Sequence, residues 1–299
     1  MLEEILKQII LEKKAQGAPK AVILNFLKEY IQYLVLNLIY NHKDFKKLVF
    51  KGGSCLRVCY VLPRLSEDLD FDYDKKAFKT LLPFLENFLS KEIKSKYFPG
   101  LETKIQSPKR IYLKFPMLYN LAIAQRPESN KLYVKIETEN KILPYAGFEL
   151  TPVSQFGFNF LAYHYDLPSL MATKINALLF RLWFKGKRQE VDIKGRDFYD
   201  LFWFYKNNVK PNWRLLKKIT KIKNEKELKT VLLRRIKKSV TTQKLEYDLK
   251  NFLPEQSFVS DFSKNYLEII KNTLLIPSSF SHTITKEERG VKEGGTLSQ

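Results

Sequence analysis

The chain has 299 residues, with 52 Lys and Arg against 32 Asp and Glu, and so a formal net charge of +20 at pH 7. Hydrophobic residues make up 44% and aromatic residues 14%, which is enough apolar surface to form a core and excludes a wholly disordered protein. The length predicts one large domain or two modest ones, and the charge predicts RNA or DNA as a partner, with a lysine-rich solvated surface as the alternative.

In the first half of the chain, apolar residues at helical spacing predict helices at residues 2–15, 20–41, 55–62 and 79–95. Short β-rich or alternating runs predict strands at residues 48–50, 69–73, 110–115 and 132–138. Strand, glycine turn and helix follow one another after residue 48. This is the order of a phosphate-binding loop.

From Leu167 onward the pattern becomes helical, with Asp166 as a candidate cap and Pro168 suited to a first turn. A loop at 186–195 precedes a helix at 196–207, and lysine-rich helices continue to about residue 275. The sequence therefore predicts a lobe at 1–155 with N-terminal helices, a helical lobe at 156–277 and a flexible tail at 278–299.

The cysteines, Cys55 and Cys59, have no second Cys or His pair beside them in the sequence, so no structural zinc is predicted. The histidines form no cluster in the sequence and are expected to be surface or core residues: His42, His164 and His282. Few cysteines and a start without a secretory signal predict a cytoplasmic protein. The apolar stretch 21–40 is interrupted by polar residues and predicts a buried helix, so no membrane association is expected.

Asp68 and Asp70 lie on one face of a predicted strand, where both carboxylates can bind the same divalent metal ions, Mg²⁺ or Mn²⁺. Upstream, the backbone of Gly53 and the hydroxyl of Ser54 are positioned to contact the phosphates of a nucleotide. The alternatives are a solvated strand face for the aspartates and a helix cap for Ser54.

Glu137 lies on a neighbouring predicted strand and is the candidate that accepts or orients a proton, with Glu139 as its alternative. Lys174 lies in an apolar helical stretch, where its charge needs a partner such as a triphosphate. Arg181, two turns further along the same face, is a candidate for the same role or for pairing with an acid.

The string Gly52-Gly53-Ser54, Arg64, Ser66 and Asp68-Leu69-Asp70-Phe71 resembles the opening motif of the AbiEii family of nucleotidyltransferase toxins, also called the MenT family. Two later segments are similar to further motifs of that family: Ala172–Ala177 with Arg181, and Arg196–Leu201 with its Arg-Asp-x-x-Asp pattern. The resemblance covers about residues 51–201.

This resemblance implies an α+β protein: a DNA polymerase β-like nucleotidyltransferase lobe with a small mixed sheet, followed by a mainly helical C-terminal lobe. It implies transfer of nucleotides from a nucleoside triphosphate (NTP) to RNA, with the 3′ acceptor end of tRNA as the expected site, and a separately encoded antitoxin as partner. It also implies that Asp197 or Asp200 belongs to the site. Their alternative is structural: with Arg196 they join the two lobes by charge-assisted hydrogen bonds.

Ser66 precedes the first candidate metal ligand by two residues, so its phosphorylation would place negative charge beside the carboxylates. The hypothesis is an off-switch, and the alternative is an ordinary loop serine. Two rival functions stay open at this point. One is nucleotidyl transfer to a protein or a small molecule, and the other is a non-catalytic nucleotide-binding or RNA-binding module with the same fold.

Overall fold

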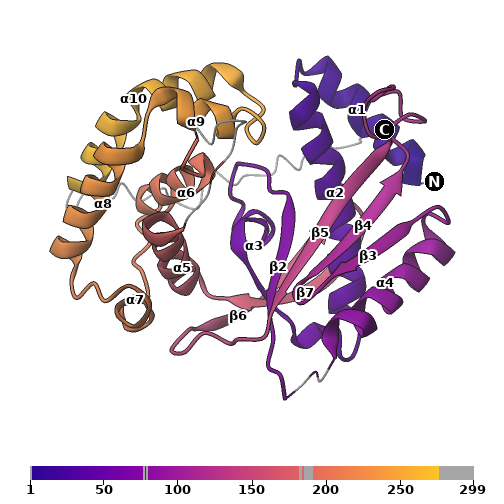
Figure 1. The fold of residues 1–299 in the computed structure, drawn as a ribbon, viewed down its shortest axis with the longest axis horizontal. Coiled ribbons are helices and arrows are strands. Elements are labelled where there is room, and N and C mark those ends of the chain that lie inside the picture. Colours follow the sequence, from indigo (N-terminus) through magenta and orange to yellow (C-terminus); the bar gives the residue numbers. More distant parts are fainter. Residues whose placement is uncertain (1, 77, 79, 182–183, 185–190, 276–299) are drawn as a thin grey trace, which may run out of the picture.

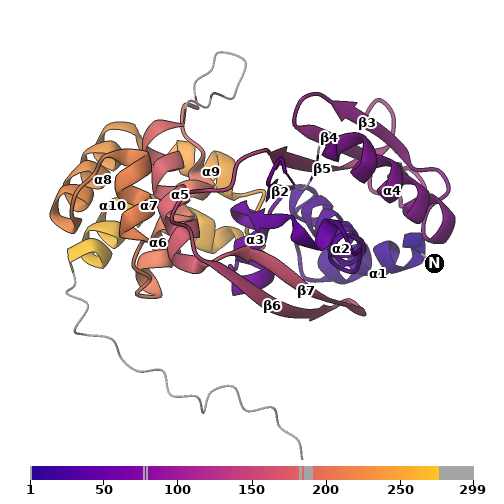
Figure 2. The same ribbon diagram turned by 90° about the horizontal axis from the view of Figure 1, so that it is seen from below.

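The computed structural model describes the chain except for residues 1, 77, 79, 182–183, 185–190 and 276–299. The described residues form a sheet with surrounding helices, and beside it a group of helices (Figures 1 and 2). The predicted α+β class with a mixed sheet and a helical C-terminal part is confirmed. The predicted flexible tail, 278–299, lies outside the described residues.

Within the described residues, seven strands form one sheet in the order β3-β4-β5-β2-β1-β7-β6. The strands are β1 (Val49–Lys51), β2 (Asp68–Asp72), β3 (Glu102–Gln106), β4 (Arg110–Pro116), β5 (Lys131–Glu139), β6 (Phe148–Gln155) and β7 (Phe158–Tyr165). β2 runs parallel to β5 and β1 parallel to β7, while the other neighbours are antiparallel. The predicted strands correspond to β1, β2, β4 and β5, and β3, β6 and β7 were not predicted.

The helices around the sheet are α1 (Leu2–Ala15), α2 (Lys20–Tyr40), the 3₁₀ turn η1 (Phe45–Lys47), α3 (Gly52–Tyr60) and α4 (Leu81–Lys96). Those of the helical part are α5 (Leu167–Phe180), α6 (Gly195–Lys206), α7 (Trp213–Thr220), α8 (Glu225–Ser239), α9 (Thr242–Leu249) and α10 (Gln256–Leu275). The helix predicted to begin at residue 55 begins three residues earlier, because the turn after β1 occurs at Gly52, with φ +82°.

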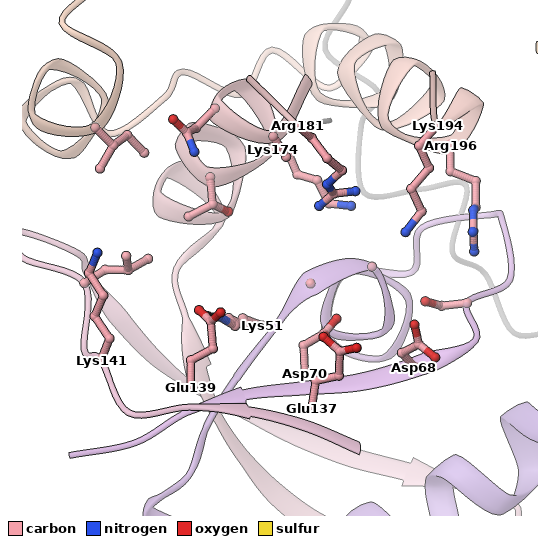
Figure 3. Close-up of a pocket in the computed structure, with 18 of the residues that line it drawn as sticks. Lys51, Asp68, Asp70, Glu137, Glu139, Lys141, Lys174, Arg181, Lys194 and Arg196 are labelled. Carbon is pink, nitrogen blue, oxygen red and sulfur yellow. Dashed lines mark hydrogen bonds and ion pairs between the residues drawn. The ribbon is translucent and has the colours of Figure 1, made fainter. Parts of the chain in front are cut away.

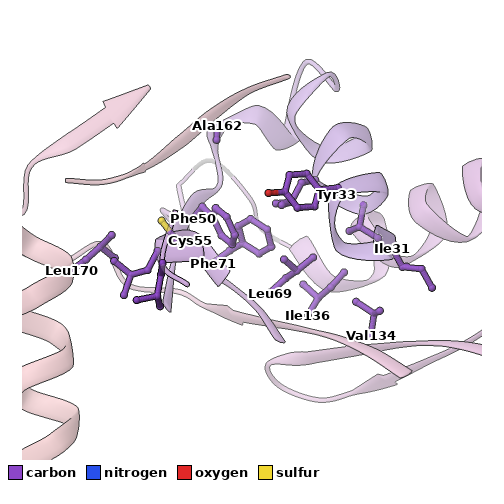
Figure 4. Packing of buried hydrophobic residues seen from close by; sticks show 14 of the residues in the cluster. Ile31, Tyr33, Phe50, Cys55, Leu69, Phe71, Val134, Ile136, Ala162 and Leu170 are labelled. Atoms are coloured by element: carbon purple, nitrogen blue, oxygen red, sulfur yellow. The ribbon is translucent and has the colours of Figure 1, made fainter. Parts of the chain in front are cut away.

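One face of the sheet is apolar and packs on α2, as Figure 4 shows. Leu69, Phe71, Val134 and Ile136 point to this face and are buried against residues such as Ile31. Side chains alternate across a strand, so the aspartates beside Leu69 and the glutamate beyond Ile136 point to the opposite face. Burial of the apolar face therefore fixes which face carries the carboxylates.

Helix α2 is long and apolar enough to cross a membrane, but 72% of its most apolar window is buried inside the structure. Leu27, Ile31 and Leu34 on this helix have no exposed surface. This is the burial of a core helix, which is the role that its interrupting polar residues predicted.

β7 pairs with β1 in the sheet, so a lobe boundary after residue 155 would separate β7 from β6. The first helix after the sheet begins at Leu167, and the Asp166 side chain accepts a hydrogen bond from the Ser169 backbone N–H at 2.9 Å, as a helix cap does. We therefore place the division between the parts near Asp166.

Candidate active site

A pocket of about 730 Å³ lies between the sheet and the helical part (Figure 3). Its sheet side carries carboxylates, among them Asp68, Asp70 and Glu137. Its helical side carries cations, among them Lys174 and Lys194, which Figure 3 shows opposite the carboxylates. A site of this form offers oxygen ligands to metal ions on one wall and positive charge to an anion on the other.

Strand pairing brings the predicted carboxylates together. In the register of β2 with β5, Asp70 is paired with Glu137 and Asp68 with Lys135. The Lys135 ammonium lies 3.0 Å from Asp68 Oδ2 and 2.7 Å from Glu137 Oε1. Arg110 Nε donates to Glu137 at 2.8 Å. Asp68, Asp70 and Glu137 thus share one face of the sheet, as the alternation predicted.

The carboxylate group has more negative charge than Lys135 balances. Burial raises the pKa of Asp70 to about 6, and the negative charges of Asp68 and Glu137 contribute in the same direction. A divalent cation bound there would relieve this repulsion, and carboxylate oxygens are the ligands that Mg²⁺ and Mn²⁺ prefer. The residues present therefore fit the predicted metal, and Asp68 and Asp70 are the pair that would hold it.

Glu139 also lines the pocket, and its carboxylate, like that of Glu137, is paired with two cations. Burial opposes its charge, yet hydrogen bonds from Lys51 at 2.9 Å and Lys109 at 3.0 Å hold the pKa of Glu139 at about 2. Glu137, the register partner of Asp70, is the better placed of the two predicted alternatives.

The turn between β1 and α3 brings backbone close to the carboxylates. A Cβ at Gly52 would overlap the Asp70 carboxylate, and a Cβ at Gly53 would lie 2.7 Å from the Arg64 guanidinium. Both glycines line the pocket. The close approach of Asp70 and Arg64 therefore requires glycine at both positions, and the contact of Gly53 with a phosphate stays a prediction.

Replacing Gly52 by alanine should reduce nucleotidyl transfer about 100-fold, because the new Cβ displaces the Asp70 carboxylate. Gly17→Ala is the matched control, since Gly17 also has a positive φ, +72°, but nothing lies within 4 Å of a Cβ there. Both variants should lose about 1–2 kcal/mol of stability to left-handed strain. Equal transfer by the two variants in a radiolabel assay would show that the contact with Asp70 is unimportant.

Ser54 does not line the pocket, and its hydroxyl is fully buried. Its Oγ donates to the backbone carbonyl of Asp68, so the hydroxyl ties α3 to β2 instead of facing a phosphate. The cap position of α3 is Lys51, so the alternative role of Ser54 as a helix cap is not seen either. Ser66 does line the pocket, with 8% of its surface exposed, and its phosphorylation stays a prediction.

Lys174 and Arg181 line the pocket, as predicted, and both are held by acids. The Lys174 ammonium lies 2.7 Å from Asp200 Oδ2 and 3.4 Å from Asp197 Oδ1, and Arg181 lies 2.8 Å from Asp197 Oδ2. Asp197 and Asp200 are buried and do not line this pocket. They position the cations from behind, so the predicted direct contact of these acids with nucleotide is not supported by the geometry.

Arg64 belongs to the opening motif, and its role is to link the two parts through a buried ion pair. Its Nε and one terminal nitrogen donate to the two oxygens of Asp200 at 2.6 and 2.7 Å, with both side chains buried. Arg196 adds a second link through Glu67 at 3.1 Å, while its contact with Asp248 at 3.2 Å lies within the helical part. The structural alternative for this motif is thus present, with Arg64 as the main partner.

Lys194 was not identified from the sequence, because it falls in the segment predicted as a loop. It lines the pocket and points toward the carboxylates in Figure 3. Within the described part of the chain it has no ion pair. Burial lowers the pKa of Lys194 to about 8, and the positive charge of Arg196 contributes in the same direction. A cation held in this way is stabilised by an incoming anion.

The family model "Nucleotidyl transferase AbiEii toxin, Type IV TA system" matches residues 34–277. Among solved structures, the nucleotidyltransferase toxin MenT4 of Mycobacterium tuberculosis H37Rv is similar with a TM-score of 0.50 and 15% identity, over 93% of this chain and 91% of that one. JHP933 from Helicobacter pylori gives 0.40 and 18%, over 84% and 96%. A nucleotidyltransferase-like protein from Paracoccidioides brasiliensis gives 0.38 and 15%, over 75% and 94%.

No curated protein sequence matches the chain significantly. The likeness to MenT4 shows the nucleotidyltransferase fold that the opening motif predicted. The family model spans most of the chain, including both sides of the pocket. The protein therefore belongs to the AbiEii family of nucleotidyltransferase toxins of type IV toxin–antitoxin systems.

Proposed function

We propose that this enzyme transfers nucleotides from an NTP to RNA, at the 3′ acceptor end of tRNA. The observation that carries the proposal is the pocket, where carboxylates on β2 and β5 face cations on and beside α5 and α6. A triphosphate between the two walls would have its charge matched by the cations and its α-phosphate beside the carboxylates.

In this proposal Asp68 and Asp70 would hold Mg²⁺ or Mn²⁺, which would neutralise negative charge on the phosphates. Lys174, Arg181 and Lys194 bind the triphosphate and favour departure of pyrophosphate. Glu137 orients the attacking RNA hydroxyl or accepts its proton. The Lys135 and Arg110 contacts of Glu137 hold its carboxylate in place beside Asp70.

A polyanionic acceptor is favoured by charge. The chain has a net charge of +20, and more cationic than acidic side chains line the pocket. Lys141 and Lys218 are among these cations. Such a field attracts RNA and concentrates it near the site. A small-molecule acceptor has no need of it. A separately encoded antitoxin is the expected partner, and the cytoplasm, which supplies both NTPs and tRNA, is the expected location.

The test is incubation of the purified protein with Mg²⁺, total tRNA and each α-labelled NTP in turn. Label should enter RNA with one or more NTPs, and pretreatment of the tRNA that removes its 3′-terminal hydroxyl should block the transfer. Label in a protein or small molecule, with none in RNA, would overturn the RNA proposal and favour the first rival. NTP binding without release of pyrophosphate to any acceptor would favour a binding module.

Replacing Lys194 by methionine should weaken binding of a non-hydrolysable NTP about tenfold, since a hydrogen bond to a charged group contributes about 1.5 kcal/mol. Because the pKa of Lys194 is about 8, wild-type affinity should fall as the pH rises above 8, and binding at pH 9 should take up a proton. Calorimetry in two buffers of different ionisation enthalpy measures this uptake.

The matched control is Lys237→Met on α8, which removes an exposed lysine far from the pocket lining. Its affinity and proton uptake should equal those of the wild type. If Lys194→Met still takes up the proton, another pocket group is the one that titrates.

A further inference from the structure

Two cysteines and a histidine meet on the side of α3 that faces β6 and β7. The Sγ atoms of Cys55 and Cys59 and a ring nitrogen of His164 all lie within 4.8 Å of one another. The cysteines are one helical turn apart, and His164 lies on β7, far away in the sequence. Each offers one ligand atom to a common point. The sequence predicted no zinc site because no Cys or His pair lies near these cysteines along the chain. In the folded protein His164 supplies an imidazole beside them.

The hydrogen bonds of the His164 ring show which of its nitrogens carries the proton. Its Nδ1 lies 2.8 Å from the backbone carbonyl of Tyr165, and a carbonyl only accepts, so Nδ1 carries the proton. The lone pair is therefore on Nε2, which is 2.8 Å from the Thr151 hydroxyl. Metal-binding histidines have this arrangement, with the second nitrogen donating to a carbonyl or carboxylate.

The three members of the cluster differ in burial. Cys55 and His164 are fully buried and Cys59 is half-buried, which leaves one side of the cluster reachable from solvent. A cation that enters from this side would replace the thiol protons. A thiolate is the form that binds metal.

We propose that Cys55, Cys59 and His164 form a second metal site, separate from the carboxylates of the active site, which takes a thiophilic cation of the Zn²⁺ class. Two thiolates and an imidazole are ligands that such ions prefer over Mg²⁺. Glu149 is the candidate for a fourth ligand, because it is the register partner of His164 across β6 and β7. Its carboxylate now accepts from Tyr60 at 2.5 Å and would turn toward the cation.

Binding would displace the thiol protons to solvent and join α3 to the β6–β7 pair. Cys55 directly follows Ser54, whose hydroxyl holds the backbone of Asp68. The cation would therefore stabilise the same helix that begins at the phosphate-binding turn. It would bind with or without nucleotide, so the inference is independent of the proposed RNA acceptor.

The test uses untagged protein, first treated with a chelator and a reductant and then titrated with Co²⁺ and Zn²⁺. These are the only two cysteines in the chain, so any thiolate-to-cobalt absorption in the near ultraviolet comes from this cluster. We expect that band, visible absorption of tetrahedral Co²⁺, loss of both on adding one equivalent of Zn²⁺, and a higher Tm with Zn²⁺.

Cys59→Ser should lose the bands and the Zn²⁺-dependent rise in Tm, while its Tm without metal stays near that of the wild type. Thr151→Val keeps every ligand atom and removes only the hydroxyl that is hydrogen-bonded to His164 Nε2, so this variant should keep the bands. Any one of three results would overturn the site. The first is a wild-type protein with no charge-transfer band, and the second is bands that persist in Cys59→Ser. The third is a disulfide between Cys55 and Cys59 that survives mild reduction.

Discussion

Replacing Asp200 by asparagine should cost about 3–5 kcal/mol of stability and abolish nucleotidyl transfer. Asp200 has no exposed surface and accepts from Arg64 at 2.6 and 2.7 Å and from Lys174 at 2.7 Å. The variant leaves a buried guanidinium without its counter-charge. It also releases Lys174, which Asp200 positions at the pocket. Urea unfolding gives the first quantity and the labelled-NTP assay the second.

The contribution of Asp200 to the stability of the fold should decrease as the pH falls. Burial disfavours the charge of Asp200, but Arg64 and Lys174 outweigh it and hold the pKa of Asp200 well below its ordinary value. The contribution to stability is therefore full above the ordinary Asp pKa of about 4 and is lost as the pH falls below it. The wild type should lose more stability than Asp200→Asn between pH 6 and pH 3.

Two comparisons separate the buried pair from a general effect of lost charge. Glu92→Gln breaks an exposed pair with Lys96 on α4, 2.7 Å apart, and should change stability by less than about 0.5 kcal/mol. The double variant Arg64→Gln with Asp200→Asn should lose less than the sum of its single variants. Additive losses would mean that the two side chains do not depend on each other.

The parts of the site that follow from local pattern were predictable. Alternation in 68–72 and 131–139 fixes which side chains of β2 and β5 share a face, so the positions of Asp68, Asp70 and Glu137 follow from the sequence. The Asp166 cap is equally local. β6 was missed because it is an edge strand with exposed apolar residues, Leu150 among them, and a proline at 152.

The pairings that cross the molecule were not predictable. Arg64 lies 136 residues from Asp200, so no local pattern shows that the acid is buried against a guanidinium instead of facing a nucleotide. Ser54 has the type and spacing of a phosphate contact, yet packing of α3 on β2 turns its hydroxyl to a backbone carbonyl. His164 meets the cysteines only through the parallel pairing of β7 with β1.

Replacing Asp68 by asparagine should lower transfer at least about 1,000-fold and leave the fold intact, because loss of several kcal/mol of charge stabilisation converts to that factor. Asp68 is partly exposed, and its only ion pair among the described residues is with Lys135, which keeps Glu137 as a partner. Single-turnover rates with Mg²⁺ measure the loss, and thermal unfolding in a chelator measures the fold.

Asp70→Asn distinguishes a metal ligand from a structural acid. Burial and its acidic neighbours raise the pKa of Asp70 to about 6, so its charge destabilises the folded protein. This destabilisation is complete above pH 6 and absent below the ordinary Asp pKa of about 4. In chelator at pH 8, Asp70→Asn should therefore be more stable than the wild type, by on the order of 1–2 kcal/mol. Below pH 4 the two should converge.

Loss of transfer together with a gain in stability would mean that the carboxylate is kept for chemistry at the expense of folding. Mg²⁺ or Mn²⁺ should raise the Tm of the wild type and leave both asparagine variants unchanged, since a cation stabilises only the form that binds it. If Asp70→Asn lost stability instead, Asp70 would be a structural partner of Lys51 or Lys194, and the metal assignment would fall to Asp68 and Glu137.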